Sequence, residues 1–120
     1  MADLDELMAQ VLRFRDERDW KQFHNPKDLA LSLVLEAGEV LEVFQWQDAQ
    51  QVAETAQARK ADLADELADV LCYTLLMAHE LGIDLAAALP AKLRKNERKY
   101  PVEKARGSSS KYTRLEPDGS

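Results

Sequence analysis

The sequence is poor in cysteine, histidine, glycine and proline, and it has no long apolar run. Its 120 residues include one cysteine, two histidines, four glycines and four prolines. So little glycine and proline excludes a collagen-like chain, and a hydrophobic share of 46% excludes a wholly disordered one. No apolar run approaches the ~18 residues of a membrane span. We therefore expect a soluble globular protein.

The lone Cys72 cannot form an internal disulfide, and the N-terminus lacks the basic and apolar regions of a secretory signal, so we expect a cytoplasmic protein. The length favours a single domain with one core. The net charge is −6, but residues 1–91 carry 7 basic and 18 acidic side chains, whereas residues 92–120 carry 9 and 4. This division argues against a nucleic-acid-binding surface over the whole protein. It favours two local electrostatic fields, one acidic and one basic.

Apolar residues recur at spacings of three and four rather than two, which predicts an all-α fold, a four-helix bundle. The expected helices cover residues 3–19, about 26–47, about 58–81 and 84 to about 99, with a shaped aromatic loop at residues 20–26. We expect the domain to cover residues 1–105 and an extended or partly disordered tail to cover residues 106–120.

Local signals mark several boundaries. Asp3 and Asp84 are suitable N-caps, and Gly82 is a suitable C-terminal stop for the third helix. Residues 48–57 could be helical or a mobile connector. Pro90 lies several residues into the fourth helix, where it removes one hydrogen bond, so we expect a kink or a late start there.

Carboxylates occupy helix positions where packing alone would place apolar residues. Residues 29–44 are apolar on nearly all sides, which is typical of a buried helix, yet Glu36 lies within the core-facing sector and Glu39 lies beside it. A buried, unpaired carboxylate costs several kcal/mol or takes up a proton. A positive ligand is therefore expected at these two residues.

A second acidic row follows on the next helix. Asp62, Glu66, Asp69 and Tyr73 are spaced by four, three and four, which places them on one face. By itself this row could equally be a solvated surface. If the two helices are antiparallel neighbours, however, the pairs Glu36/Glu39 and Glu66/Asp69 surround one space.

Four carboxylates around one space form an all-oxygen cation site. Two histidines and one cysteine provide too few soft or imidazole ligands for Zn²⁺ or copper, so Mg²⁺ fits, with Mn²⁺ as a substitute. A ferritin-like di-iron site would require a Glu-x-x-His motif, and neither acidic pair supplies it. The metal interpretation is the favoured one.

The basic run at residues 92–99 is usually a solvated face, or else a nucleic-acid patch. A third interpretation follows from the acidic rows, because Lys92, Asn96 and Lys99 share one helix face and could hold a polyphosphate whose other side is bound by metal. Trp20, Phe23, Trp46 and Tyr73 are candidates for stacking on a nucleobase. For Phe14 and Phe44 we favour core packing.

Three segments together resemble a known family: Glu36-Ala37-Gly38-Glu39-Val40-Leu41-Glu42, Glu66-Leu67-Ala68-Asp69-Val70-Leu71, and Lys92-x-x-x-Asn96-x-x-x-Tyr100-Pro101. They are similar to the MazG-type all-α nucleoside triphosphate pyrophosphohydrolases over roughly residues 5–115. Segments 17–24, 44–46 and 106–112 are closer still to the single-domain, pyrimidine-preferring branch of that family.

The resemblance implies a role for each matching residue. Glu36, Glu39, Glu66 and Asp69 would coordinate Mg²⁺. The substrate-binding residues implied are Trp20, Trp46, Tyr73 and Asn96 around the base, Lys92, Tyr100, Arg98 and Lys111 at the phosphates and the pocket rim, and His24. Val11 departs from the pattern, because a polar pocket residue is expected there, and this leaves the preferred base open.

The implied activity is hydrolysis of a deoxynucleoside triphosphate, dCTP or a 5-modified dCTP above all, to the monophosphate and pyrophosphate. A water in the site would lose its proton to Glu36 or Glu39 and attack the α-phosphorus in line. Such an enzyme would clear surplus or modified nucleotides. A related dUTP or phosphoribosyl-ATP hydrolase and a non-enzymatic helical interaction module remain as alternatives.

The expected assembly is a homo-oligomer. The second and third expected helices are apolar over most of their circumference, so another subunit should cover part of them. The resemblance implies a dimer at least, or a dimer paired into a tetramer, with neighbouring subunits completing each pocket. We expect no membrane partner and no nucleic-acid polymer as a partner.

Overall fold

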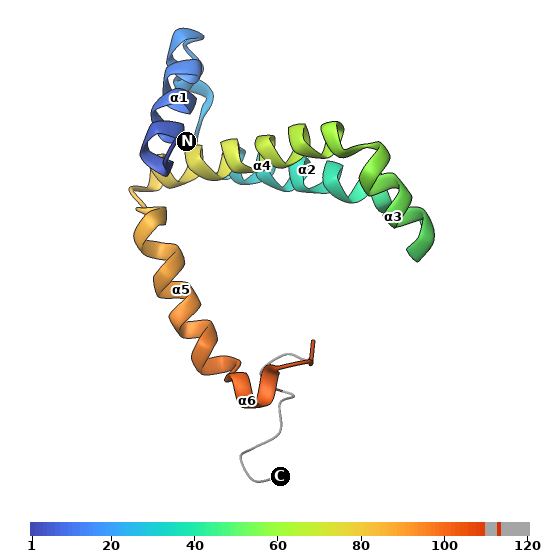
Figure 1. Cartoon of the computed structure of the whole chain (residues 1–120). Helices are drawn as coiled ribbons and strands as arrows, with labels where there is room; N and C mark the ends of the chain where they lie inside the picture. Colours follow the sequence, from blue (N-terminus) through green and yellow to red (C-terminus); the bar gives the residue numbers. More distant parts are fainter. Residues whose placement is uncertain (110–112, 114–120) are drawn as a thin grey trace. The chain divides into compact units, whose positions relative to one another are not determined.

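The computed structural model describes residues 1–109 and 113, and within them it contains helices and no strand, which confirms the all-α prediction (Figure 1). The elements are α1 (Leu4–Glu17), a short 3₁₀ helix η1 (Lys21–Phe23), α2 (Pro26–Phe44), α3 (Ala49–Ala58), α4 (Lys60–Leu81), α5 (Leu85–Lys99) and α6 (Val102–Ala105). A first unit, Met1–Ile83, holds α1 to α4, and a second begins at Asp84 and holds α5 and α6.

The first unit is organised around the antiparallel pair α2 and α4, which lie side by side in Figure 1. Helix α1 packs against α4, and the short α3 connects the pair. The buried apolar side chains are Leu29 and Val43 of α2 and Leu75, Leu76 and Ala78 of α4. The core of this unit therefore lies between α2 and α4.

Side-chain caps explain where several helices begin. The Asp3 side chain accepts a hydrogen bond of 2.9 Å from the Glu6 backbone N–H, as expected. Asp48 and Gln51 form a capping box, with both bonds at 2.9 Å, and this starts α3. Residues 49–58 are therefore helical, which resolves the alternative left open by their polar composition.

The turn after α1 reverses the chain through one unusual residue. Asp19 has φ 54°, in the left-handed region, where non-glycine residues are uncommon. Its carbonyl and carboxylate both accept hydrogen bonds of 3.0 Å from Gln22 Nε2. The Trp20 backbone N–H then donates to the Arg15 carbonyl at 3.1 Å, which fixes Trp20 against the end of α1.

Gly82 ends α4 in the left-handed conformation, with φ 68°, as the sequence predicts. Asp84 caps α5 by accepting from the Ala86 N–H at 3.0 Å. Pro90 lies inside one uninterrupted helix, so the expectation of a late start is wrong. The predicted tail lies mostly outside the described residues.

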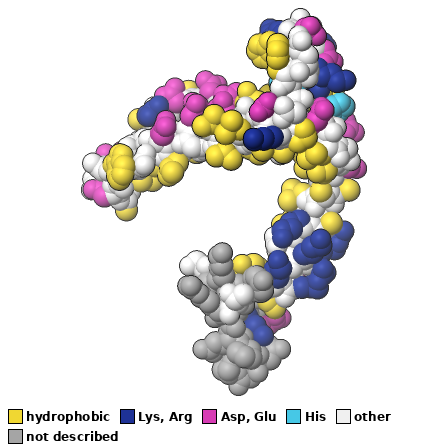
Figure 2. All heavy atoms as spheres, turned by 180° about the vertical axis from the view of Figure 1, so that it is seen from behind, with side chains coloured by type: hydrophobic (Ala, Val, Ile, Leu, Met, Phe, Trp, Pro, Cys, Tyr) yellow, Lys and Arg dark blue, Asp and Glu magenta, His cyan; other side chains and the backbone are white. Residues whose placement is uncertain are grey.

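Only one side of α2 is buried within the first unit, although its sequence is apolar on nearly all sides. The opposite side exposes Leu31, Val34, Leu35 and Leu41, each by 57–66%. Figure 2 shows apolar side chains in yellow over the α2–α4 pair, and Lys and Arg in dark blue along α5. Among the described residues no single helix has the length and composition to span a membrane, and α4 and α5 meet that test only when taken together.

Candidate metal centre and adjoining cavity

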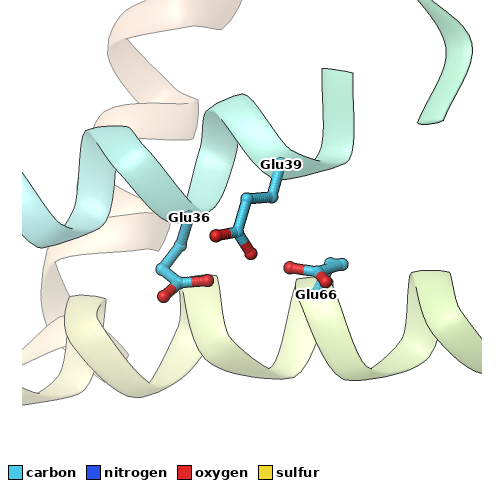
Figure 3. A group of neighbouring side chains, drawn as sticks. All are labelled: Glu36, Glu39 and Glu66. Carbon is cyan, nitrogen blue, oxygen red and sulfur yellow. The ribbon is translucent and has the colours of Figure 1, made fainter. Parts of the chain in front are cut away.

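Three carboxylates meet between α2 and α4. Each of Glu36, Glu39 and Glu66 offers one oxygen, and these oxygens lie within 4.8 Å of one another. Figure 3 shows Glu36 and Glu39 descending from α2 toward Glu66 on α4. The three-residue spacing on α2 places both of its carboxylates on the side that faces α4. The structure therefore brings together three of the four predicted metal ligands.

The electrostatics of this cluster are unfavourable without a ligand. Oε2 of Glu36 and Oε2 of Glu66 are buried and have no hydrogen-bond partner within the described part of the chain. Burial first, and then the charges of Glu39 and Asp69, raise the pKa of Glu36. A hydrogen bond with Glu39, together with burial and the neighbouring charges, raises the pKa of Glu66 to about 7.

These features fit a hard divalent cation. The donor set is carboxylate oxygen alone, which Mg²⁺ and Mn²⁺ prefer. The two unpartnered oxygens have free lone pairs for such an ion. A cation would also remove the repulsion that raises both pKa values, so the residues present suit the predicted metal.

The fourth predicted ligand, Asp69, lies one turn along α4 from Glu66 and outside the group of three. Its charge still acts on Glu36 and Glu66. Asp62, at the start of the same row, is exposed and forms a 3.1 Å ion pair with Arg59. The solvated-surface interpretation is therefore correct for Asp62.

A cavity of about 230 Å³ adjoins the cluster, and Glu36 belongs to both. Along α4 its wall is formed by Asp69, Cys72, Tyr73 and Leu76. Seven residues of helix separate the first of these from the last, a rise of about 10 Å. The cavity thus has a carboxylate end at Asp69 and an apolar end toward Leu76.

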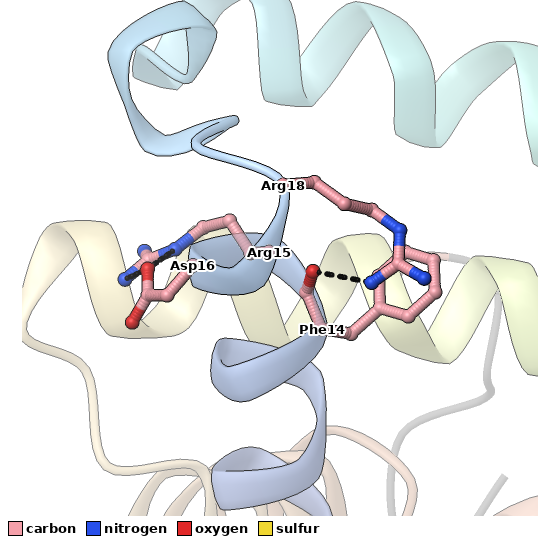
Figure 4. A network of polar contacts seen from close by, with 4 residues as sticks. All are labelled: Phe14, Arg15, Asp16 and Arg18. Carbon is pink, nitrogen blue, oxygen red and sulfur yellow. Dashed lines mark hydrogen bonds and ion pairs between the residues drawn. The ribbon is translucent and has the colours of Figure 1, made fainter.

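Aromatic side chains form the opposite wall. Phe14 and Trp20 line the cavity and make an edge-to-face contact, with ring centroids 5.7 Å apart and planes at 75°. The Arg18 guanidinium lies 3.7 Å from the centre of the Phe14 ring and donates to the Phe14 carbonyl at 2.9 Å (Figure 4). Phe14 is half exposed, so the prediction of core packing is wrong for this residue.

Arg15 lies in the same wall and is almost completely buried, with 5% of its surface exposed. Its Nε and Nη2 both contact Asp16 Oδ1 at 2.8 Å (Figure 4). The hydrogen bond from Arg15 is the main reason that the pKa of Asp16 is lowered. A permanently charged side chain, neutralised by Asp16, is therefore among the residues of the cavity wall.

Three further polar groups line the cavity. His24 Nδ1 is buried and has no hydrogen-bond partner among the described residues, so it is available to a ligand. Burial and the nearby carboxylates raise the pKa of Cys72, which keeps the thiol protonated. Burial and the charge of Glu36 likewise raise the pKa of Tyr73, although hydrogen bonding with Ser32 opposes the shift.

The structure does not bring all the predicted binding residues to this cavity. Trp46 lies just beyond the end of α2 and is 91% exposed. Lys92, Asn96 and Tyr100 belong to the second unit, and Lys111 lies outside the described residues. Trp20, His24, Tyr73 and the carboxylates therefore form the part of the predicted site that one unit contains.

Sequence reasoning missed Arg15, Cys72 and Leu76 as cavity residues. A usable signal existed for Arg15, because it follows Leu7 and Val11 at intervals of four and so occupies the middle of the apolar stripe of α1. A charge in an apolar stripe is the same signal that identified Glu36. Cys72 and Leu76 carry no such signal, since both are ordinary core residues by type.

Comparison with known proteins identifies a family and individual relatives. Residues 31–115 match the model of the MazG-like family. The dCTP pyrophosphatase 1 proteins of mammals are similar along most of the chain: that of Bos taurus is 40% identical over 114 residues, or 93% of this chain and 68% of the bovine protein. That of Homo sapiens is 42% identical over 114 residues, covering 93% and 67%.

A solved structure agrees with the sequence relatives. The crystal structure of a pyrophosphatase from Archaeoglobus fulgidus superposes with a TM-score of 0.79 at 39% identity, covering 84% of this chain and 94% of that one. The resemblance seen in the motifs is confirmed. Both kinds of comparison lead to enzymes, so the alternative of a non-enzymatic interaction module is not supported.

Proposed function

Because the chain belongs to the MazG-like family, we propose that it is a metal-dependent pyrophosphohydrolase of deoxypyrimidine triphosphates, with dCTP or a 5-modified dCTP as its main substrate. The name dCTP pyrophosphatase 1, carried by relatives at 40–42% identity, supports this substrate class. The products would be the nucleoside monophosphate and pyrophosphate, and the role would be control of the nucleotide pool.

The observation that carries the proposal is the junction of cluster and cavity at Glu36. One carboxylate takes part in an oxygen-only cluster and also lines a recess that contains Trp20 and Tyr73. A nucleotide has the same two parts, an anionic polyphosphate and an aromatic base, joined by one sugar. A cation site beside an aromatic recess therefore matches the chemistry of a nucleotide's two parts and the order in which they are joined.

The recess suits the base rather than the whole nucleotide. Its volume of about 230 Å³ lies below the ~300–1,000 Å³ of pockets that enclose a complete small ligand. Trp20 and Tyr73 offer ring faces for stacking. His24, with its buried and unpartnered Nδ1, is placed to bond a sugar hydroxyl or a base edge.

Glu36, Glu39 and Glu66, with Asp69 beside them, would hold Mg²⁺. When bound, the ion would neutralise triphosphate oxygens and polarise the α-phosphate. Glu36 or Glu39 would accept the proton of the attacking water, with Glu36 favoured because it borders the recess. The water oxygen forms a bond to the α-phosphorus, the bond to the β-phosphate oxygen breaks, and pyrophosphate leaves with the electron pair.

The family resemblance also implies binding residues within the second unit. Lys92 and Asn96 lie on one face of α5, four residues apart, and Tyr100 follows the end of that helix. We include these three, with Arg98 and Lys111, as binding residues on the family resemblance. Lys92→Ala should then raise KM with little change in the fold, because Lys92 is exposed.

Assembly would complete the site. The outward face of α2, formed by Leu31, Val34, Leu35 and Leu41, is too apolar to remain in water, and a second copy of the chain would cover it. We propose a dimer, or a dimer of dimers, in which the exposed Trp46 of one subunit reaches the recess of another. Light scattering should give a multiple of 13.6 kDa, and an active 13.6 kDa particle would contradict this assembly.

The test of the function is pyrophosphate release with Mg²⁺ over the standard and 5-modified deoxynucleoside triphosphates. Pyrimidine substrates, led by dCTP or a 5-modified dCTP, should be hydrolysed to the monophosphate, and chelation of the metal should stop turnover. Release of inorganic phosphate instead of pyrophosphate, or turnover that ignores the base, would contradict the proposal. Preference for dUTP or phosphoribosyl-ATP would select a related hydrolase.

A further inference from the structure

Phe14 and Trp20, the aromatic pair of the cavity wall, are not held in place by burial. Half of the Phe14 surface and 44% of the Trp20 surface are exposed. Exposed side chains exchange rotamers within picoseconds to nanoseconds unless contacts restrain them. A ring that stacks on a base binds it more tightly when the ring is already ordered, because binding then loses less conformational entropy. Contacts that order this pair therefore affect the affinity of the recess.

Arg18 makes two contacts with Phe14, one with its ring and one with its backbone (Figure 4). The guanidinium carbon lies 3.7 Å from the centre of the Phe14 ring, a cation–π contact. Nη1 of Arg18 also donates a hydrogen bond of 2.9 Å to the Phe14 carbonyl oxygen. The hydrogen bond holds the guanidinium near the backbone of Phe14, and the cation–π contact holds the ring beneath the guanidinium. Together the two contacts favour one orientation of the Phe14 side chain.

The end of α1 does not by itself explain this geometry. Carbonyl groups in the last turn of a helix lack partners within the helix, so a donor near the Phe14 carbonyl is expected there. That requirement does not place the guanidinium over the ring. Arg18 is exposed, and an exposed arginine ordinarily extends its charged end into solvent. Its position over Phe14 therefore points to a role that involves the ring.

Phe14 in turn contacts Trp20. The two rings meet edge to face, with centroids 5.7 Å apart and planes at 75°. The Trp20 backbone N–H donates to the Arg15 carbonyl at 3.1 Å, which holds the main chain of Trp20 at the same place. A nearly perpendicular contact covers at most one face of the Trp20 indole. Phe14 therefore restrains the indole and leaves its other face for a base.

We propose that Arg18 is a positioning residue: by holding Phe14, it orders the Trp20 ring for stacking on the pyrimidine base of the substrate. This inference rests on the proposed function. Phe14 lines both the cavity and a second, more open recess of about 290 Å³, whereas Arg18 lines neither. The effect of Arg18 on base binding therefore has to pass through the aromatic pair.

The first test is kinetic. Arg18→Gln removes the cation and should raise KM for dCTP about two- to tenfold, the range for immobilising one side chain on binding, with kcat nearly unchanged. Arg18→Lys keeps a cation that can lie over the ring and should recover part of the loss. Arg13→Gln is the matched control, because it removes the same charge from the same helix, and Arg13 is exposed and pairs with Glu17 at 4.0 Å. Its KM should equal that of the parent protein.

A double-mutant cycle with Phe14 tests the route of the effect. Phe14→Leu should raise KM for dCTP, and adding Arg18→Gln to that variant should raise it no further, because the contact between the two side chains is already lost. Two increases that multiply, or an unchanged KM in Phe14→Leu, would overturn the proposal.

The second test needs no substrate. In a Trp46→Phe background the remaining tryptophan is Trp20, so the fluorescence anisotropy reports the motion of that ring. Arg18→Gln should lower the anisotropy and Arg13→Gln should not. The melting temperature of the Arg18→Gln protein should change little, because an exposed cation–π contact is weak. An anisotropy equal to that of the background protein would overturn the proposal.

The outcomes separate the two proposals. If the parent protein releases no pyrophosphate from dCTP or another pyrimidine triphosphate, the proposed function fails, and the anisotropy alone decides whether Arg18 orders Trp20. If dCTP is hydrolysed and Arg18→Gln leaves KM or the anisotropy unchanged, only the inference about Arg18 fails. If Arg18→Gln lowers the melting temperature strongly and reduces kcat as much as it raises KM, Arg18 is a structural residue of α1, and the inference is again overturned.

Discussion

The carboxylate cluster and the buried Arg15 solve the problem of buried charge in opposite ways. Glu36 and Glu66 hold unpartnered carboxylate oxygens; burial and the charges of Glu39 and Asp69 raise the pKa of Glu36, and a hydrogen bond with Glu39 together with burial raises that of Glu66. Arg15 is more deeply buried, but Asp16 neutralises it at 2.8 Å. The cluster is electrostatically unfavourable without a ligand, whereas Arg15 already has its counter-charge.

This difference shows two ways in which a protein interior can hold charge. A cation that is neutralised by a neighbouring carboxylate can stay in a buried position without a ligand. Uncompensated carboxylates repel one another until a proton or a cation neutralises them. The carboxylate cluster and the Arg15–Asp16 pair should therefore respond differently to mutation and to pH.

The largest effect is expected at the carboxylate end. Glu36→Gln, Glu39→Gln and Glu66→Gln should each lower turnover by more than about a hundredfold, since changes outside a metal's direct ligands already cost 10–100-fold. Asp69→Asn should also impair turnover. Pyrophosphate release measures the effect, and circular dichroism should show an intact fold whose metal-free melting temperature holds or rises, because repulsion is relieved.

Asp62→Asn is the control for these variants, because Asp62 belongs to the same acidic row but pairs with Arg59 at the surface. It should keep nearly full activity. Full activity in any one of the cluster variants would remove that residue from the site.

The next largest effect is expected at the aromatic wall. Trp20→Ala should raise KM for pyrimidine triphosphates, because a lost stack is worth ~1–3 kcal/mol per base, while kcat changes less. Steady-state kinetics on dCTP separates the two constants. Phe23→Ala is the matched control, since Phe23 is an exposed aromatic of the same loop and does not line the cavity. Equal KM values for the two variants would show that Trp20 is not part of the base site.

The pH dependence of stability should have opposite signs at Glu66 and at Asp16, and Glu66 should dominate near neutrality. The pKa of Glu66 is about 7 in the folded chain and near 4.5 when unfolded, so the folded state binds the extra proton. Metal-free protein should therefore gain stability as the pH falls from 8 to about 5. Urea titrations across this range measure it, and Glu66→Gln should flatten the curve. A metal-free protein that loses stability over that range would contradict the assignment.

The smallest effect is expected from Asp16→Asn, which removes the charge that pairs with Arg15. The pKa of Asp16 is lowered in the folded state, so its contribution to stability is present above its unfolded value of 3.8 and is lost as the pH falls through the folded value. The variant should melt slightly below the parent at pH 7 and together with it near pH 2. A difference that persists at pH 2 would mean that the ion pair is not its cause.

Much of this arrangement can be predicted from sequence because charge in an apolar stripe is a strong signal. Glu36 and Glu39 stand out for that reason, and the spacing of Glu66 and Asp69 places the matching row on the partner helix. Arg15 carries the same signal in α1. Its burial does not follow from the sequence, because long basic side chains usually extend their charged end to solvent even when they lie on a partly apolar helix.

Other features could not be obtained from periodicity. A helical wheel assigns Trp46 to an element end, but its exposure depends on how the chain packs around it. The second face of α2 is apolar in sequence, so nothing there distinguishes a surface covered by the same chain from one covered by another copy. For α3, a polar and alanine-rich composition is compatible with two outcomes, and the Asp48–Gln51 capping box was the local signal that decided between them.

The left-handed residue at the end of α1 has a consequence for how this protein can diverge. Asp19, with φ 54°, directly precedes Trp20, so the backbone there sets the entry of the aromatic loop. Asparagine and glycine adopt such a φ readily, whereas β-branched residues are strained there by roughly 1–3 kcal/mol. Few amino acids should therefore be tolerated at position 19 in a library of functional variants, even though the Asp19 side chain is exposed and does not line the cavity.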